Sequence, residues 1–192
     1  MRSPLRLAAL GLLLVGSLDP GMARAGNDEH GLALPMRLHY LALGGIMAPV
    51  GPQGRPLSRG PYAGVAVLGE SAIGMQLGGE ASFVASGDVL RTHFTSLGVI
   101  ARMSPTPDDY RVYVQLGVGL YEVTYSPKVA GVSAPGTTVR PGGSFGIGLE
   151  VFQTTHVSVG GLLCYHGVVL ASRTARSYMI AGLSLTLRPS DY

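Results

Sequence analysis

The residues of this chain that could carry chemistry are few and lie far apart in the sequence. Only 13% of the 192 residues are charged, and Lys128 is the single lysine. Six charged or titratable residues stand singly among glycines, serines and large apolar residues: Arg37, Glu80, Arg102, Arg111, Glu150 and His166. Isolated groups of this kind are buried at low cost only when they find an opposite charge or a hydrogen-bond partner. These six residues form a candidate polar network, provided that the fold brings them together.

Metal binding and nucleophilic catalysis have less support. Cys164 and His166 share a face with each other, and His39 lies far upstream, but no spacing brings together the three or four ligands that a metal requires. His93 and Ser96 have the wrong spacing for a catalytic triad and no acid nearby. The glycine-rich piece "GGSFGIG" (142–148) matches no phosphate-loop or dinucleotide fingerprint. We therefore predict no catalytic residue, no metal ligand and no cofactor.

The first 25 residues are typical of a secretory signal. "MRSPLR" provides the positive region, 7–18 is an apolar run, and Ala23-Arg24-Ala25 fits a cleavage site. Twelve apolar residues are too few to span a bilayer as a helix. Export implies an oxidising compartment, yet Cys164 is the only cysteine, so no disulfide within the chain can stabilise it. The arginines are scattered, which argues against nucleic-acid binding.

After the signal, segments of about ten residues with alternating character are separated by turns. They lie near 36–45, 61–69, 73–85, 90–103, 110–125, 142–152, 157–168 and 178–188. A two-residue period predicts β-strands with one apolar and one small or polar face, and the glycine density disfavours helix. The alternation is clear in 110–121, where Val112 to Leu120 oppose Arg111 to Tyr121. It is blurred in 36–45, where Leu41 and Leu43 follow His39. In 144–152 it places Phe152 on the same face as Glu150.

Eight strands suit two exported barrels, a soluble one and a membrane one. The two differ in polarity, because a membrane barrel turns its apolar faces outward. Here the apolar faces are nearly uninterrupted, whereas the opposite faces carry glycine, serine, glutamine and a few charges. A water-exposed surface of that composition would be poorly soluble, so we predict an eight-stranded antiparallel up-and-down transmembrane β-barrel.

The glycines of "VYVQLGVGLYEV" (112–123) fit this polarity. The interior of an eight-stranded barrel is barely wide enough for side chains. If Val112 to Leu120 face outward, Gly117 and Gly119 face inward and make room for Tyr113, Tyr121 and residues of opposite strands. Glu122 then marks the outer rim.

The lengths of the connections agree with a membrane barrel. Short turns are predicted near 69–72, 104–109 and 153–156. At the other end lie the long connections 46–60 and 126–141, the intermediate 169–177 and the short 86–89. Short periplasmic turns and longer outer loops are the expected asymmetry. Arg102, Arg111 and Glu150 then lie near the periplasmic end, where they could cluster, with Glu80 deeper inside.

Three stretches carry a resemblance to a known family. "RTHFTSLGVIARMSPTPDDYRVYVQLGVGLYEV", "FGIGLEVFQTTHVSVGGLLCYHGVV" and "MIAGLSLTL" resemble hairpins and the closing strand of small outer-membrane β-barrel proteins of the OmpX and opacity-protein type. The resemblance covers roughly 60–188 and implies fold and location more than activity. One departure is that Tyr192 is in phase with Ser184 and Thr186 rather than with the apolar face.

Some barrels of this size modify lipid A, and the deacylase type carries a His-x-Ser motif. Here "CYH" is followed by Gly167, so an enzyme is the weaker alternative. The charged residues inside could act as a salt-bridge gate in a narrow small-solute pore. We favour instead a paired network that fills a closed lumen.

The sequence thus predicts a signal peptide (1–25), a periplasmic lead-in (26–35), a barrel (36–188) and a short tail (189–192). Sec-type export would deliver the chain to the outer membrane of a Gram-negative cell. Expected partners are outer-membrane lipid, lipopolysaccharide, the barrel-assembly machinery and an unknown extracellular partner of the loops. We expect a monomer with a structural or surface-interaction role.

Overall fold

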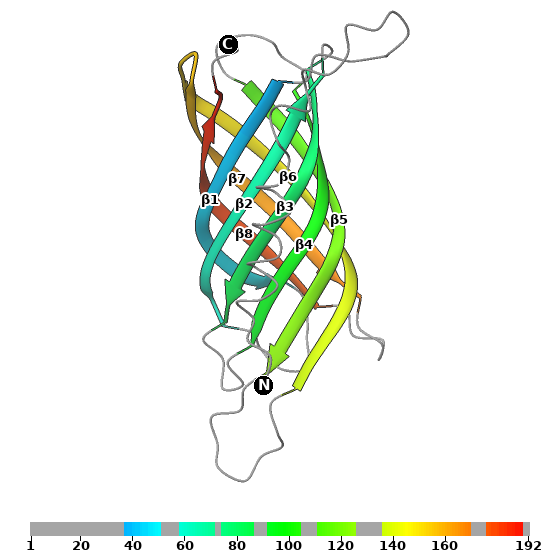
Figure 1. Cartoon of the computed structure of the whole chain (residues 1–192). Helices are drawn as coiled ribbons and strands as arrows, with labels where there is room; N and C mark the ends of the chain where they lie inside the picture. Colours follow the sequence, from blue (N-terminus) through cyan, green and yellow to red (C-terminus); the bar gives the residue numbers. More distant parts are fainter. Residues whose placement is uncertain are drawn as a thin grey trace, which may run out of the picture.

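A computed structural model describes residues 37–50, 58–71, 74–86, 92–104, 111–125, 136–169 and 176–189. Within them, eight antiparallel strands pair in sequence order and close into a barrel, because β1 also pairs with β8 (Figure 1). The strands are β1 (Arg37–Val50), β2 (Gly60–Glu70), β3 (Met75–Ala85), β4 (His93–Met103), β5 (Arg111–Tyr125), β6 (Gly136–Gln153), β7 (Val157–Val168) and β8 (Arg176–Leu187). The predicted fold class is confirmed.

None of the described segments forms a helix that is long and apolar enough to cross a membrane.

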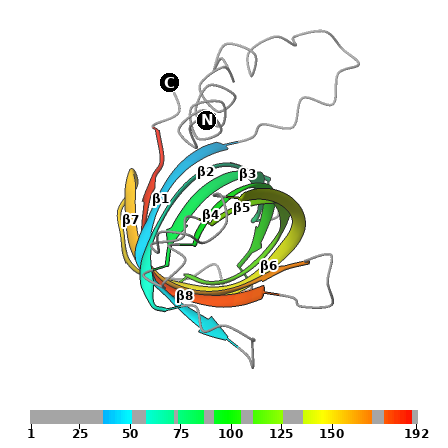
Figure 2. The same cartoon turned by 90° about the horizontal axis from the view of Figure 1, so that it is seen from below.

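The connections divide between the two ends of the barrel. The turn end carries the connections 71–74, 104–110 and 154–156, the start of β1 and the end of β8. The loop end carries the connections 51–59, 86–92, 126–135 and 169–175. Figure 2 looks along the barrel and shows the strands forming a continuous ring. The predicted turns and loops lie between the strands that meet at these two ends. Residues 51–57, 72–73, 87–91, 105–110, 126–135 and 170–175 lie outside the described residues, so most of the predicted turn 104–109 does as well.

β1 and β6 extend further toward the loop end than the sequence predicted. β1 continues to Val50 and β6 begins at Gly136, whereas proline and glycine had suggested loops there. Pro49, Pro61 and Pro141 each lie where the strand pairs with one neighbour only, since the second ladder begins or ends beside them. A proline lacks the N–H that a second ladder would need, so strands tolerate it at such positions.

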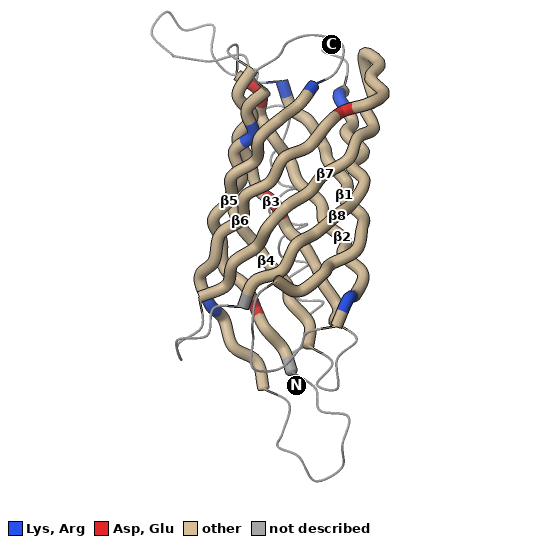
Figure 3. The backbone as a smooth tube through the Cα atoms, turned by 180° about the vertical axis from the view of Figure 1, so that it is seen from behind, with Lys and Arg blue, Asp and Glu red and all other residues tan. Residues whose placement is uncertain are grey.

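Side chains alternate between a filled lumen and an apolar exterior. Large apolar side chains are exposed all around the wall, among them Val99, Leu116, Val118, Phe145, Ile147, Leu163 and Leu183. Charged residues gather toward the two ends, and the middle of the wall is almost free of them (Figure 3). An apolar surface of this extent suits contact with lipid rather than water. The predicted outward-apolar polarity is therefore the one that the barrel has.

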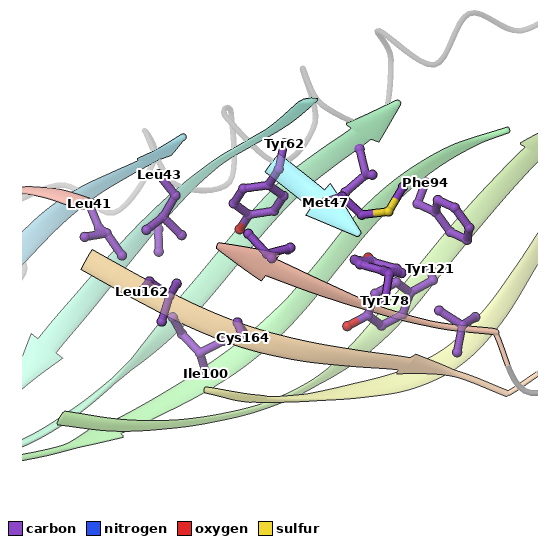
Figure 4. Close-up of a cluster of buried hydrophobic side chains, with 14 of the residues drawn as sticks. Leu41, Leu43, Met47, Tyr62, Phe94, Ile100, Tyr121, Leu162, Cys164 and Tyr178 are labelled. Atoms are coloured by element: carbon purple, nitrogen blue, oxygen red, sulfur yellow. The ribbon is translucent and has the colours of Figure 1, made fainter. Parts of the chain in front are cut away.

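The lumen is packed with buried side chains that come from all eight strands. Figure 4 shows ten of them labelled, including Met47, Phe94, Tyr121 and Tyr178, converging from opposite walls. Met47, Val84 and Val123 are fully buried. An eight-stranded barrel of this kind holds side chains rather than a wide channel.

Glycines of β6 make room for the inward tyrosines of β5. A Cβ at Gly148 would overlap the ring of Tyr113, its direct cross-strand partner, and a Cβ at Gly142 would lie 2.6 Å from Cε2 of Tyr121. Gly117 and Gly119, which the sequence suggested for this role, instead accommodate other neighbours: a Cβ at Gly119 would lie 2.7 Å from Cα of Gly98. Glycines do make room for the inward tyrosines, as predicted, but these glycines are Gly142 and Gly148 of β6 rather than Gly117 and Gly119 of β5.

We predict that Gly148→Ala destabilises the barrel by about 1–3 kcal/mol, the usual cost of overpacking, because the new methyl group displaces the Tyr113 ring. The matched control is Gly44→Ala, since a Cβ at Gly44 meets nothing within 4 Å. The measurement is the urea midpoint of refolded protein in lipid vesicles, followed by gel mobility. An equal midpoint for the two variants would contradict the role of Gly148.

A β-bulge in β6 reverses the predicted orientation of Phe152. The register shifts between Glu150, which pairs with Gly160, and Phe152, which pairs with Val159. Both Val151 and Phe152 are exposed on the outside. Phe152 therefore does not share the inward face of Glu150, because the extra residue resets the two-residue period. The same shift turns Gln153 inward, opposite Ser158.

Candidate functional site

The candidate polar residues lie on inward positions of the barrel, but the structure divides them into separate groups rather than one network. Two groups are ion pairs near the turn end, one is a hydrogen-bonded chain deeper in the lumen, and one is an aromatic cluster. Each group is built from inward residues of different strands, some on adjacent strands, such as Arg102 and its direct cross-strand neighbour Gln115, and some on strands that do not pair, such as Arg111 and Glu70.

The deepest charged group joins β3, β4 and β5. Arg102 donates from Nε to Oε1 of Gln115 at 2.8 Å, and Gln115 donates from Nε2 to Oε2 of Glu80 at 3.1 Å. The guanidinium of Arg102 also lies 4.5 Å from the ring centre of Tyr113, a cation–π geometry. Glu80, Arg102 and Gln115 are all buried. Gln115 thus connects two opposite charges that do not touch each other.

The second group lies at the turn end, on β1, β2 and β5. His39 Nε2 is 2.7 Å from Oε2 of Glu70, and Arg111 Nη1 is 3.5 Å from Oε1 of the same carboxylate. His39 is buried, whereas Arg111 is partly exposed at the rim. One carboxylate therefore serves two basic partners, and the longer Arg111 contact is the weaker of the two.

The third group fastens β6, β7 and the end of β8 together. Arg188 donates from Nη2 to Oε2 of Glu150 at 2.8 Å and lies 3.4 Å from Oγ of Ser158. With its amide oxygen toward Arg188, Gln153 accepts from Nη1 at 2.7 Å. The two charged side chains are only 14% and 7% exposed. This is the most completely bonded ion pair in the described part of the barrel.

His166 belongs to an aromatic cluster and not to the ion pairs. Its Nδ1 is 3.0 Å from the hydroxyl oxygen of Tyr121, and its ring stacks on Tyr178 with 4.9 Å between centres. Phe94 packs against the other side of the cluster, 5.2 Å from Tyr178. His166 therefore acts here as a hydrogen-bonded packing residue, in contact with aromatic rings rather than with carboxylates.

The sequence suggested that Arg102, Arg111 and Glu150 could cluster near the turn end. The three residues do line one cavity there, and Arg111 is the direct cross-strand neighbour of Glu150. Each of them nevertheless bonds a different partner. Arg37 is at the exposed start of β1. Sequence reasoning missed Glu70 and Gln115, although Gln115 lies on the inward face of 110–121, a position that could have indicated it.

The residues considered for metal binding and catalysis are also placed. Within the described residues no three His, Cys, Asp or Glu side chains gather where they could hold a metal. Cys164 is a buried free thiol on the inward face of β7. Ser96 faces inward and shares a 2.6 Å hydrogen bond with Ser82, whereas His93 stacks on the outward ring of Phe83. His93 and Ser96 therefore lie on opposite sides of the wall.

At the loop end the β5–β6 hairpin projects beyond its neighbour. β6 pairs with β5 from Gly136 onward, but with β7 only from Gly142. Among the described residues, 136–140 therefore pair on the β5 side only, while the carbonyl of Pro141 still accepts from the N–H of Val169. Val139 in this segment is 52% exposed. Thr124 and Thr137 face each other near the tip, with hydroxyl oxygens 3.4 Å apart.

Comparison with known proteins agrees with this architecture. The sequence matches no protein-family profile and no curated protein. Among solved structures, Neisserial surface protein A is similar with a TM-score of 0.62 and 10% identity over 80% of this chain and 97% of that one. The N-terminal β-barrel domain of Pseudomonas aeruginosa OprF has a TM-score of 0.51 and 17% identity over 78% of this chain and 95% of that domain.

Both neighbours share the barrel fold of this chain, which confirms the fold class predicted from the sequence, that of a small eight-stranded antiparallel barrel of the outer-membrane type. The resemblance to the OmpX and opacity-protein type drawn from the sequence is confirmed at the level of fold. At such low identity the likeness concerns the fold alone, and residue roles have to be argued from the side chains of this chain.

Proposed function

We propose that this protein resides in the outer membrane as an integral barrel with a structural and surface-interaction role. The observation that carries the proposal is the combination of an apolar exterior with a packed lumen. The wall then serves as a lipid contact and the interior as a core. The ends, and above all the loop end, remain as the surfaces available to other molecules.

The packed lumen favours a closed barrel over the alternative of a narrow pore. Met47 of β1, Val84 of β3 and Val123 of β5 come from different sides of the ring, and each is fully buried. A continuous water path would leave some surface of such side chains accessible. The charged groups near the turn end add the ion pairs Arg111–Glu70 and Arg188–Glu150 to this closure rather than opposed like charges.

The loop end is the proposed contact surface. The sequence suggested the connections 46–60 and 126–141 for this role. Apart from 58–59, which precede β2, their described residues belong to strands β1, β2 and β6. The projecting β5–β6 hairpin places Glu122 and Arg140 beyond the end of β7. Mixed charge on a projecting element suits recognition of a polar partner outside the cell.

The remaining parts of the proposal follow from this location. Lipid and lipopolysaccharide surround the outer surface of the barrel. The barrel-assembly machinery is the partner that inserts the protein into the membrane after Sec-type export. Closure leaves no unpaired edge in the membrane-spanning part, so the proposal needs no second subunit. It assigns no catalytic activity; release of fatty acid from lipopolysaccharide by the purified protein would replace it with the enzyme alternative.

We predict that the outer-membrane fraction contains a heat-modifiable species on SDS gels. A closed barrel resists the detergent until it is boiled and then changes mobility, because its strands unfold only with heat. A soluble periplasmic protein without a mobility shift would contradict the membrane location.

Planar-bilayer recordings test the closed lumen separately. We expect the purified barrel to show no steady conductance at physiological salt. Steady openings would favour the pore, and a change of those openings in Glu150→Gln would assign the gate to the Arg188 pair. A heat-modifiable protein that also conducts would retain the membrane location and overturn only the closed lumen.

A further inference from the structure

Two residues with buried donor atoms that have no hydrogen-bond partner line one small cavity at the turn end of the lumen. The cavity has a volume of about 20 Å³ and is lined by Gln76, Arg102, Ser104, Arg111, Tyr113 and Glu150. Among the described residues, Nη2 of Arg102 and the hydroxyl of Tyr113 are buried and have no hydrogen-bond partner. Both side chains are more than nine-tenths buried. Leaving such donors unpaired is costly, and most of all for a charged group.

Of the charged groups that the structure describes around the cavity, the guanidinium of Arg102 is the one that has no oppositely charged group bonded to it directly. Its link to Glu80 passes through Gln115. Glu150, the carboxylate in the cavity wall, is already bonded by Arg188 at 2.8 Å. Arg111 adds a second guanidinium, whose ion pair within the described residues is the 3.5 Å contact with Glu70. The residues with hydrogen-bond donors that line the cavity are therefore mainly positive or neutral.

We propose that this cavity is a binding site for one small inorganic anion of the halide class, held by Nη2 of Arg102 and the hydroxyl of Tyr113. A charge-assisted N–H and a neutral O–H donor both satisfy such an anion. A volume of about 20 Å³ holds a single small species, and we therefore assign the site to chloride or bromide rather than to phosphate or a carboxylated metabolite. Access is from the turn end, where Gly74, Ser104 and Arg111 border the cavity.

The first test is structural and uses the wild-type full-length mature protein. Crystals grown in sodium bromide are expected to show an anomalous peak within hydrogen-bond distance of Arg102 Nη2 and the Tyr113 hydroxyl. A water molecule at that position, or bromide bound elsewhere with none in the cavity, would overturn the proposal. This test depends on no variant and is independent of the interaction role proposed above.

The second test measures affinity in solution. Thermal unfolding in detergent is followed while chloride replaces gluconate, an anion too large for the cavity, at constant ionic strength. The wild-type midpoint is expected to rise with chloride, and the half-saturating concentration in Tyr113→Phe to be about tenfold higher, the effect of one lost hydrogen bond to a charge. Tyr178→Phe is the matched control, because the Tyr178 hydroxyl also lacks a partner but lies in the aromatic cluster.

Equal chloride dependence of the two tyrosine variants would overturn the assignment of the donor. Absence of any chloride-specific rise in the wild type would overturn the site itself. If Tyr113→Phe does not fold, the bromide crystals still decide.

Discussion

Arginine at position 118 is expected to cost about 2–4 kcal/mol of barrel stability in lipid, the penalty for a basic residue on the lipid face near mid-bilayer. Val118 lies in the middle of β5 on the outward face and is 71% exposed. Its cross-strand neighbours are Val99 and Gly143, so no acidic side chain lies directly beside it to pair with the new charge. The variant should insert poorly and unfold at lower urea concentration.

The matched control is Val139→Arg, which adds the same side chain at another exposed valine. Val139 is 52% exposed and lies on the part of β6 that projects beyond β7. Because Val139 lies near the loop end and directly opposite Glu122, which can pair with the new charge, the cost should be about 0–1 kcal/mol, as near a membrane interface. The measurement is the urea midpoint of each variant refolded into vesicles, followed by cold-gel mobility.

The difference between the two variants is the informative quantity. In a water-soluble barrel both arginines would be solvated, and both midpoints would stay near that of the wild type. A cost confined to Val118→Arg would therefore establish by measurement that the outer surface of the barrel contacts lipid, which its apolar composition alone only suggests. Equal small effects would contradict the membrane location while leaving the fold intact.

The fold could be predicted because one periodicity determines it. The apolar face of 110–121 alternates without interruption, and the structure turns Leu116, Val118 and Leu120 outward. The same rule was ambiguous in 36–45, because Leu41 and Leu43 are apolar residues that point into the lumen with His39. Where the lumen of a membrane barrel is packed like a core, apolar side chains occur on both faces of a strand. In such strands the alternation of apolar and polar residues no longer distinguishes inward from outward positions.

Positions that depend on register could not be predicted. One extra residue at Val151 reverses Phe152 and turns Gln153 toward Arg188, and no residue type in "EVFQ" signals a bulge. The pairing of Tyr113 with Gly148 likewise follows from the β5–β6 register, which the sequence of either strand alone does not contain.

The polar groups show the same limit. Alternation placed Glu80, Arg102, Arg111 and Glu150 on inward faces, but not opposite their partners. Strand tilt and stagger decide that Arg102 meets Gln115 and that Arg111 meets Glu70. Tyr192, whose unusual phase the sequence revealed, lies outside the described residues. Which face a residue occupies is therefore a local property, whereas its partner is a property of the closed barrel.

Removal of Arg188 is expected to have the largest effect of any single substitution considered. Glu150 is only 7% exposed and bonds Arg188 at 2.8 Å, so Arg188→Ala leaves a buried carboxylate without its cation. Breaking a buried pair from one side costs about 3–5 kcal/mol. The backbone contribution of position 188, its N–H bond to the carbonyl of His156, is unchanged in the alanine variant.

Arg111→Ala is the matched control. Arg111 makes a longer, 3.5 Å contact and is 29% exposed, and its partner Glu70 keeps His39 at 2.7 Å after the change. The cost should therefore be about 0–1 kcal/mol, as for a surface pair. Urea midpoints in vesicles measure both variants, and Arg188→Ala combined with Glu150→Gln should recover much of the loss, because the orphaned charge is removed.

The position of this pair makes the result informative about function as well as stability. Arg188 follows the last strand and joins β8 to β6 across β7, close to where β8 closes the barrel against β1. The apolar layer of Met47, Val84 and Val123 does not include the pair. A large loss of stability in Arg188→Ala without any conductance would thus show that the luminal ion pair stabilises a closed barrel. Conductance gained at little cost in stability would instead identify the pair as the gate of a pore.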